Sequence, residues 1–120
     1  MVLSLEEFDR VFNWNDAVIT YLQMASNSVH MDVTFVTFKQ SKNQQSKYFP
    51  YKYADIKVHI IFKDVTLLTD YYYSPLNKLL ERFTCPYICD SNEINEKGEF
   101  VIDDCLRIVC KEVEVNNLPR

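Results

Sequence analysis

The chain has 120 residues, of which 48% are hydrophobic, 14% aromatic and 25% charged, a composition typical of one ordinary globular domain. A domain of this length buries roughly two-thirds of its extended-chain surface, so it needs no metal or disulfide to hold a core. Charged residues interrupt every apolar run, and none reaches the ~20 residues of a membrane-spanning helix. The first ten residues contain three acids, unlike a secretory signal. We therefore expect a cytoplasmic protein that does not enter a membrane.

Charge is unevenly distributed along the chain, although the net charge is only -4. Residues 39–57 contain five lysines and one aspartate, whereas residues 84–115 contain eight acidic and three basic residues. With one glycine and four prolines, the chain shows no linker or repeat, and we predict a single domain over residues 1–120.

The N-terminal segment has the pattern of a short helix. Ser4, followed by Glu7 three positions later, matches a capping box. The apolar residues that follow recur at helical spacing: Leu5, Phe8, Val11 and Phe12. We expect this helix to end near Asn13, and we expect Trp14 and Asp16 at the next junction to be structural, with the Asp16 carboxylate accepting backbone N–H groups.

Extended segments follow. Residues 16–24 are mostly apolar or β-branched, 25–28 suggest a turn, and 29–38 alternate between apolar and polar side chains, as in a half-buried antiparallel strand. The same alternation returns from Asp55 to Phe62. Lys63 and Asp64 are expected to form a bend before a further strand over 65–73.

The last third is predicted to hold a short helix and a hairpin. Pro75 should open a helix over 75–83, with Ser74 as its cap and apolar residues on its inner side: Leu76, Leu79, Leu80 and Phe83. Residues 87–94 and 99–110 are expected to pair, with Gly98 supplying a positive φ in the connecting turn. The fold class predicted is α+β and mainly antiparallel: six or so strands in a curved sheet, with a short N-terminal helix and a second near 75–83.

Enzymatic motifs are mostly absent, since a single glycine excludes a Gly-rich phosphate loop and a Gly-x-Ser-x-Gly nucleophile turn. Cys105 and Cys110 would lie on opposite faces of a strand, which argues against a zinc site built from the four cysteines. His30, His59 and Asp32 lie on predicted polar strand faces, where they could form a metal site if the strands were neighbours. We expect instead solvated histidines, no metal, no cofactor and no catalytic residue.

Two aromatic clusters suggest binding surfaces. The first interleaves cations with rings, as single-stranded nucleic-acid sites do, and its candidate residues are Lys47, Tyr48, Tyr51 and Lys52. The alternative is a strand with its rings in the core, which we favour. The second cluster is Tyr71, Tyr72 and Tyr73, of which at least one must be exposed because consecutive strand residues cannot share a face. Exposed tyrosine beside charge is typical of protein contacts.

The segment from Trp14 to Met24 resembles small bacterial proteins that begin with an aromatic residue, then His or Asn, then Asp-Ala and a strand. The resemblance continues through residues 29–38 and 60–68 and covers about half the chain. These families include a class of polymorphic-toxin immunity proteins. Such a resemblance implies stoichiometric occlusion of a toxin, typically with an acidic face against a basic nuclease. This chain has Asn15 where those proteins usually have His, so no imidazole role carries over.

We therefore predict a non-enzymatic protein-binding module that acts as a stoichiometric inhibitor, such as a toxin-immunity protein or an inhibitor of a bacterial defence protein carried by a phage or another mobile element. The partner-binding candidates are Tyr71, Tyr72, Tyr73, Asp90, Glu93, Glu96 and Glu99. Nucleic-acid or nucleotide binding through residues 47–53 is the alternative. A homodimer that forms by pairing of an exposed strand edge is also possible from the sequence.

Overall fold

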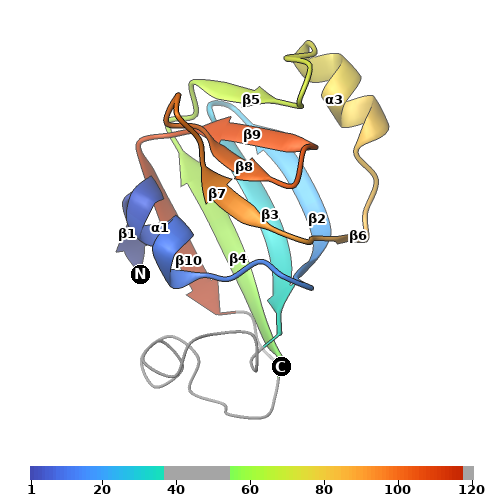
Figure 1. The fold of residues 1–120 in the computed structure, drawn as a ribbon. Helices are drawn as coiled ribbons and strands as arrows, with labels where there is room; N and C mark the ends of the chain where they lie inside the picture. Colours follow the sequence, from blue (N-terminus) through green and yellow to red (C-terminus); the bar gives the residue numbers. More distant parts are fainter. Residues whose placement is uncertain (37–54, 118–120) are drawn as a thin grey trace.

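A computed structural model describes residues 1–36 and 55–117, which form two antiparallel sheets packed face to face (Figure 1). The larger sheet has the strand order β1-β10-β4-β3-β2-β6, and the smaller one β5-β9-β8-β7. The large-sheet strands are β1 (Val2–Leu3), β2 (Val18–Ala25), β3 (Ser28–Phe35), β4 (Ile56–Lys63), β6 (Tyr87–Ile88) and β10 (Glu112–Asn117). The small-sheet strands are β5 (Leu67–Thr69), β7 (Asn92–Ile94), β8 (Phe100–Ile102) and β9 (Leu106–Val109).

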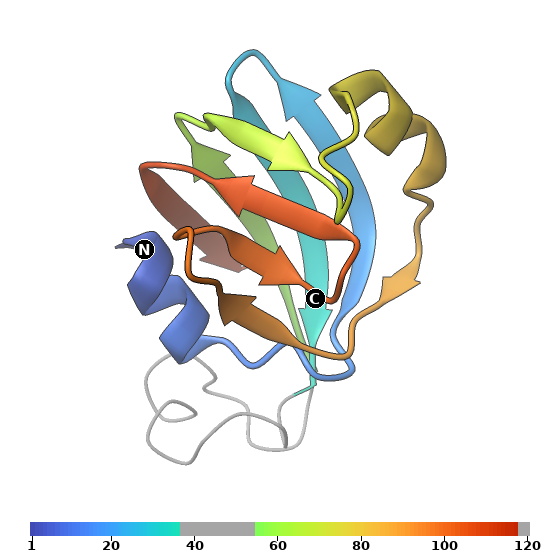
Figure 2. The ribbon, with the colours of Figure 1, turned by 45° about the horizontal axis from the view of Figure 1, so that its top comes forward.

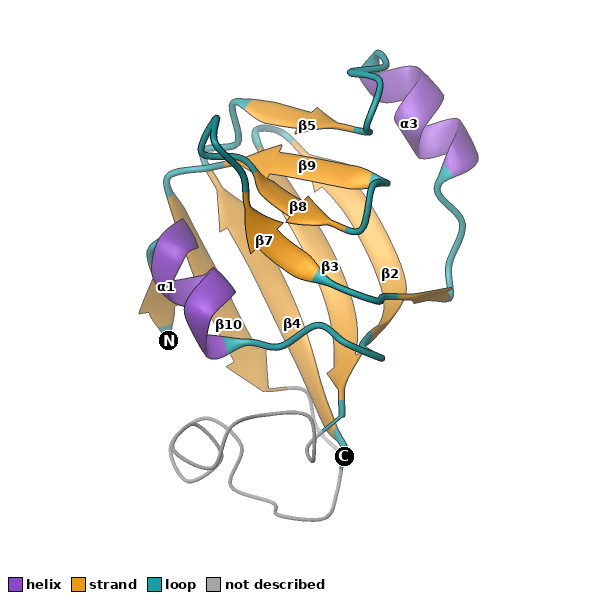
Figure 3. Ribbon diagram, in the orientation of Figure 1, coloured by secondary structure: helices purple, strands orange, loops and turns teal. Residues whose placement is uncertain are grey.

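Two short helices flank the sheets at opposite edges. Figure 2 shows the small sheet lying over the large one, with α1 (Leu5–Val11) beside β7 and β10, and α3 (Leu76–Arg82) beyond β5. The predicted α+β, mainly antiparallel class is therefore confirmed, whereas the prediction of one sheet is incomplete, because a second sheet covers one face (Figure 3). No helix in the two described segments is long and apolar enough to cross a membrane.

The central strands β3 and β4 confirm the predicted alternation. Their inward side chains are almost fully buried, and the list is Val29, Met31, Val33, Phe35, Ile56, Val58, Ile60 and Phe62. Because Cβ atoms alternate across a strand, the intervening residues face away from the small sheet. That outer face is polar and includes His30, Asp32 and His59, each of intermediate exposure.

The N-terminal helix also forms as predicted. The Ser4 side chain accepts from the backbone of Glu7, and the Glu7 carboxylate accepts from the backbone of Ser4, which completes the capping box. Phe8 is fully buried and lies at the centre of the aromatic core, with ring contacts to Trp14 and to Phe100 of the small sheet. The helix thus closes one end of the space between the sheets.

The predicted strand over 65–73 is too long. The strand β5 ends at Thr69, and residues 70–73 turn because Asp70 Oδ1 accepts from the backbone N–H groups of Tyr72 and Ser74, each over 3.0 Å. The helix expected over 75–83 is present as α3, but Pro75 rather than Ser74 occupies its cap position and no side chain caps it. Only Leu79 of its expected inner residues is buried, because α3 lies at the edge of the fold.

The C-terminal hairpin is more divided than predicted. Residues 87–94 split between β6 of the large sheet and β7 of the small one, and residues 99–110 split into β8 and β9. The break falls at Asp103, whose positive φ of 50° turns the chain. Gly98 has φ 77°, as predicted for its turn. The strands β1 and β10 were not predicted.

Candidate functional site

Residues 70–73, which we call the tyrosine turn, project from the edge of the small sheet. All three rings are partly or largely exposed, and Tyr72 is the most exposed at 81%. The backbone N–H of Ser74 is the main cause that lowers the pKa of the Asp70 carboxyl at the base of this turn. Hydrogen bonds donated to Asp70 hold the turn, and Tyr71 and Tyr72 lie side by side with ring centroids 5.1 Å apart in a T-shaped contact.

Tyr73 is directed differently, toward a buried carboxylate. Its hydroxyl donates to Glu99 Oε1 over 3.0 Å, and Arg107 Nη1 donates to the same oxygen over 3.0 Å. A side-chain hydrogen bond from Asn95, at 2.7 Å, is the leading cause that lowers the Glu99 pKa, and burial opposes it. Glu99 is only 4% exposed. It therefore supports the turn from beneath, and it is buried where we expected an exposed carboxylate.

Cations lie beneath the tyrosine rings. The Arg107 guanidinium carbon is 5.2 Å from the centre of the Tyr71 ring and 4.9 Å from that of Tyr73. Lys97 Nζ lies 5.0 Å from the centre of the Tyr73 ring. A cation in this position is attracted to the electron-rich face of the aromatic ring. Tyr71 and Tyr73 are thus each in contact with a cation, and all three tyrosines remain open to solvent.

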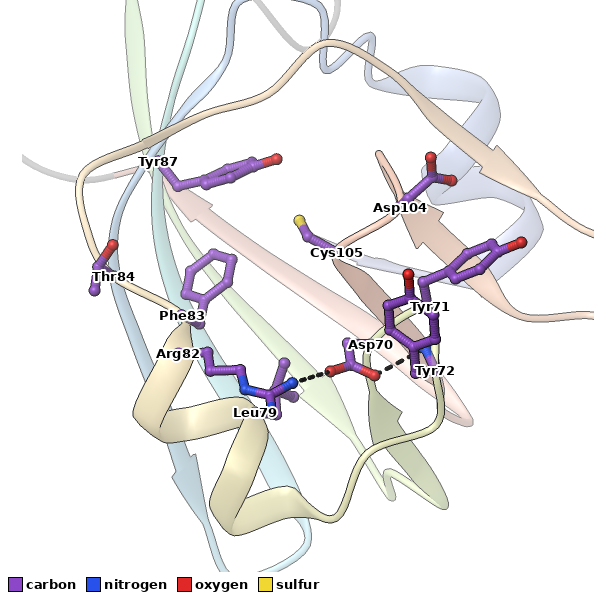
Figure 4. A pocket seen from close by; sticks show the side chains of 10 residues that line it. All are labelled: Asp70, Tyr71, Tyr72, Leu79, Arg82, Phe83, Thr84, Tyr87, Asp104 and Cys105. Carbon is purple, nitrogen blue, oxygen red and sulfur yellow. Dashed lines mark hydrogen bonds and ion pairs between the residues drawn. The ribbon is translucent and has the colours of Figure 1, made fainter.

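A hollow of about 330 Å³ lies beside this turn and is shown in Figure 4. Tyr71 and Tyr72 border one side, and Phe83 and Tyr87 border another. An ion pair of 3.9 Å between Arg82 and Asp70 lies along its rim. We call it the aromatic hollow. Its lining comes from the tyrosine turn, from α3 and the residues that follow it, from β6 and from the turn that joins β8 to β9.

A second hollow, of about 360 Å³, adjoins the first and shares Tyr87 and Asp104 with it. We call it the acidic hollow, since four of its lining residues are acids and none is basic: Asp90, Glu93, Asp103 and Asp104. The Asp103 carboxylate is engaged within the protein, because it accepts hydrogen bonds from the Tyr87 hydroxyl and from the backbone N–H groups of Asp90 and Ser91. The carboxylates of Asp90, Glu93 and Asp104 make no hydrogen bond or ion pair with another residue of the described segments.

The structure thus brings together part of the predicted set. Tyr71 and Tyr72 border the aromatic hollow and Asp90 and Glu93 the acidic one, whereas Glu96 lies further along, in the exposed turn between β7 and β8. Sequence reasoning missed Tyr87 and Asp104, the two residues that line both hollows. Leu76 and Leu80 were expected on the inner side of α3, but the position of this helix at the edge of the fold leaves them exposed.

A separate polar cluster lies on the outer face of the large sheet. The strands of His30 and His59 are neighbours, as the metal alternative required. His59 Nδ1 lies 2.6 Å from Asp32 Oδ1, and His59 Nε2 lies 3.1 Å from His30 Nδ1. His30 Nε2 in turn lies 3.2 Å from Ser28 Oγ. No group of three His, Cys, Asp or Glu side chains in residues 1–36 and 55–117 is arranged to hold a metal ion by itself.

Other predicted residues have structural positions or lie elsewhere. Trp14 is fully buried in the core. Asp16 is exposed and its backbone N–H donates to the carbonyl oxygen of Cys89 over 2.9 Å, while the role expected of its carboxylate stays a prediction. All four cysteines are free thiols, of which only Cys85 is exposed. The nucleic-acid candidates fall outside the described residues, and these are Lys47, Tyr48, Tyr51 and Lys52.

Comparisons of this chain with protein-family models, with curated proteins and with solved structures found no match.

Proposed function

We propose that this protein acts by binding another protein, through the surface formed by the aromatic and acidic hollows. We call this surface the tyrosine–acid face, and it consists of Tyr71, Tyr72, Tyr87, Asp90, Glu93 and Asp104. The observation that carries the proposal is Tyr72, which is 81% exposed on a turn held by hydrogen bonds. It lines the aromatic hollow, and the adjoining acidic hollow presents three carboxylates that make no hydrogen bond or ion pair in the described segments.

An exposed aromatic ring on a fixed backbone suits a binding contact. Tyrosine contributes a large contact area and has few torsions to immobilise. The Asp70 hydrogen bonds and the Arg107 contact already restrict this turn. Little conformational freedom is therefore lost on binding, which favours affinity.

The lining of the two hollows defines the chemistry of the partner. The aromatic hollow offers ring faces and the apolar side chains of Leu79 and Phe83, whereas the acidic hollow offers only carboxylates as charged groups. A partner surface with an apolar or aromatic side chain next to lysine or arginine complements both. Such complementarity speeds association and makes it sensitive to salt.

Binding of this kind is the activity of a stoichiometric inhibitor. We propose that the chain occludes a basic protein, as a toxin-immunity protein or a phage-encoded inhibitor of a bacterial defence protein would. The resemblance of residues 14–24 to immunity proteins motivates the first version. We propose no reaction for the protein.

The test is capture of partners by the wild-type chain, followed by binding measurements with the purified partner. The variant Tyr72→Ala should weaken 1:1 binding at least tenfold, and Glu93→Lys should slow association. Tyr21→Ala and Glu6→Lys are matched controls, since both residues are exposed and lie away from the two hollows. Equal affinity of Tyr72→Ala and Tyr21→Ala for the purified partner would contradict the proposal.

A further inference from the structure

His30 and His59 form a polar cluster with Asp32, apart from the two hollows. It lies on the face of the large sheet opposite the small sheet. They lie on the adjacent strands β3 and β4, where Asp32 is the direct cross-strand neighbour of His59. The two rings are diagonal neighbours, with centroids 5.3 Å apart. Both side chains are of intermediate exposure, so solvent and small ions can reach them.

Hydrogen bonding orients both rings. Because the Asp32 carboxylate can only accept, His59 Nδ1, 2.6 Å away, carries a proton. His59 Nε2 is then directed at His30 Nδ1 over 3.1 Å. The other nitrogen of His30 contacts Ser28 Oγ, whose hydroxyl also lies 2.8 Å from the carbonyl oxygen of Ala25. His59 is therefore held at Nδ1 by Asp32, and His30 is held at Nε2 by Ser28. The remaining nitrogens, His59 Nε2 and His30 Nδ1, are directed at each other.

We propose that His30 Nδ1 and His59 Nε2 together bind one divalent transition-metal ion, with solvent completing its coordination. Histidine ligands of metals usually donate their second ring N–H to a carboxylate or another acceptor, which fixes the ring and increases its basicity. Asp32 occupies that position behind His59, and Ser28 stands behind His30. The ion would take the place of the contact between the two rings.

The spacing of the two nitrogens fits such an ion. Metal–nitrogen bonds of about 2.0–2.1 Å, when they span the observed 3.1 Å, meet at roughly 98°. This angle lies between those of octahedral and tetrahedral coordination. Imidazole nitrogen suits Zn²⁺, Ni²⁺ and Cu²⁺, and a two-nitrogen site should follow the general order in which Cu²⁺ binds most tightly. With only two protein ligands, coordination positions remain open to water or to a ligand atom of a partner.

The site is independent of the tyrosine–acid face. It lies on the other side of the large sheet from the small sheet, which carries part of both hollows. Metal binding can therefore be measured without a protein partner. Its outcome does not decide the proposed function.

The experiment is calorimetric titration of the tag-free chain with ZnCl₂, NiCl₂ and CuCl₂. It is done in a Cys85→Ser background, because Cys85 is the exposed thiol. We expect one ion per chain, at least tenfold weaker binding in His30→Gln and His59→Gln, and ten- to hundredfold weaker binding in Asp32→Asn. Asp64→Asn makes the same chemical change in a turn and should bind as wild type.

A second measurement uses the unsubstituted rings. Substoichiometric Cu²⁺ should broaden the imidazole NMR signals of His30 and His59 before any other signals. The proposal is overturned if no ion binds saturably at millimolar concentration. It is equally overturned if the two imidazole signals are unaffected, or if a folded His30→Gln/His59→Gln double variant retains wild-type affinity.

Discussion

The hydroxyl of Tyr87 donates a 2.7 Å hydrogen bond to Oδ2 of Asp103. Tyr87 belongs to the last strand of the large sheet, and Asp103 begins the turn between two strands of the small sheet. Burial is the main cause that raises the Tyr87 pKa, and this keeps the hydroxyl protonated as a donor. This hydrogen bond therefore connects the two sheets beside Tyr87, a residue that lines both the aromatic and the acidic hollow.

Asp103→Ala should destabilise the fold by about 2–4 kcal/mol. The substitution removes hydrogen bonds from Tyr87, Asp90 and Ser91, and a bond to a charged group contributes about 1.5–3 kcal/mol. Because Asp103 is of intermediate exposure, water replaces part of these bonds and the loss stays well below their sum. Alanine also tolerates the positive φ poorly. Asp103→Asn should lose less, since asparagine adopts positive φ more readily. Urea unfolding measures both, and a change below about 0.5 kcal/mol in Asp103→Ala would refute this role.

Arg107→Leu should cost about 3 kcal/mol of stability. It leaves the buried Glu99 carboxylate without its cationic partner, and breaking such a pair on one side costs about 3–5 kcal/mol. Because Glu99 keeps its hydrogen bonds from Asn95 and Tyr73, we expect a loss at the lower end of this range. The double variant with Glu99→Gln should lose less than the sum of the single losses. Strict additivity would show that the two side chains are not coupled.

Glu99 should also make stability depend on pH. Its pKa in the folded protein lies below the usual value of about 4.5, so its contribution is present above about pH 4.5 and is lost as the pH falls through the folded pKa. The difference in unfolding free energy between wild type and Glu99→Gln should therefore be constant near neutrality and shrink in acid. Because Asp70 and Glu114 also have lowered pKa values, the comparison with the variant is essential. A difference that grows below pH 4.5 would contradict this assignment.

Phe8→Ala should be the most damaging of the single substitutions considered. Phe8 is fully buried, and its ring contacts Phe62 of the large sheet and Phe100 of the small one. Removal of a buried phenylalanine side chain costs about 3–5 kcal/mol. Tyr72→Ala, at an exposed position, should stay within about 0.5 kcal/mol of wild type. Thermal and urea unfolding compare the two; similar losses would mean that the core is placed incorrectly.

The predictable part of the fold is the part with local causes. The capping box at Ser4 and the alternation along β3 and β4 depend only on neighbouring residues, and the structure contains all three. The strand β10 has the same alternation over Glu112–Val115, so its signal was present in the sequence. The turn at Asp103 had none, because an aspartate in the left-handed region is held there by distant donors.

The candidate sites show the same division. We predicted an exposed tyrosine from three consecutive rings, although the three lie in a turn and not in the expected strand. The burial of Glu99, just before β8, depends on Arg107 of β9. The polar faces of His30 and His59 could be read from the sequence. Their contact could not, since it requires that β3 and β4 be neighbours in a particular register.

The most direct test of the account is the salt dependence of 1:1 binding to the purified partner, measured for wild type and for a variant with Tyr72→Ala, Glu93→Lys and Asp104→Lys. We predict that association of the wild type slows as salt rises, and that the variant loses both this dependence and at least a hundredfold in affinity while it unfolds like the wild type. Unchanged affinity and salt dependence in the folded variant would contradict the tyrosine–acid face as the binding surface.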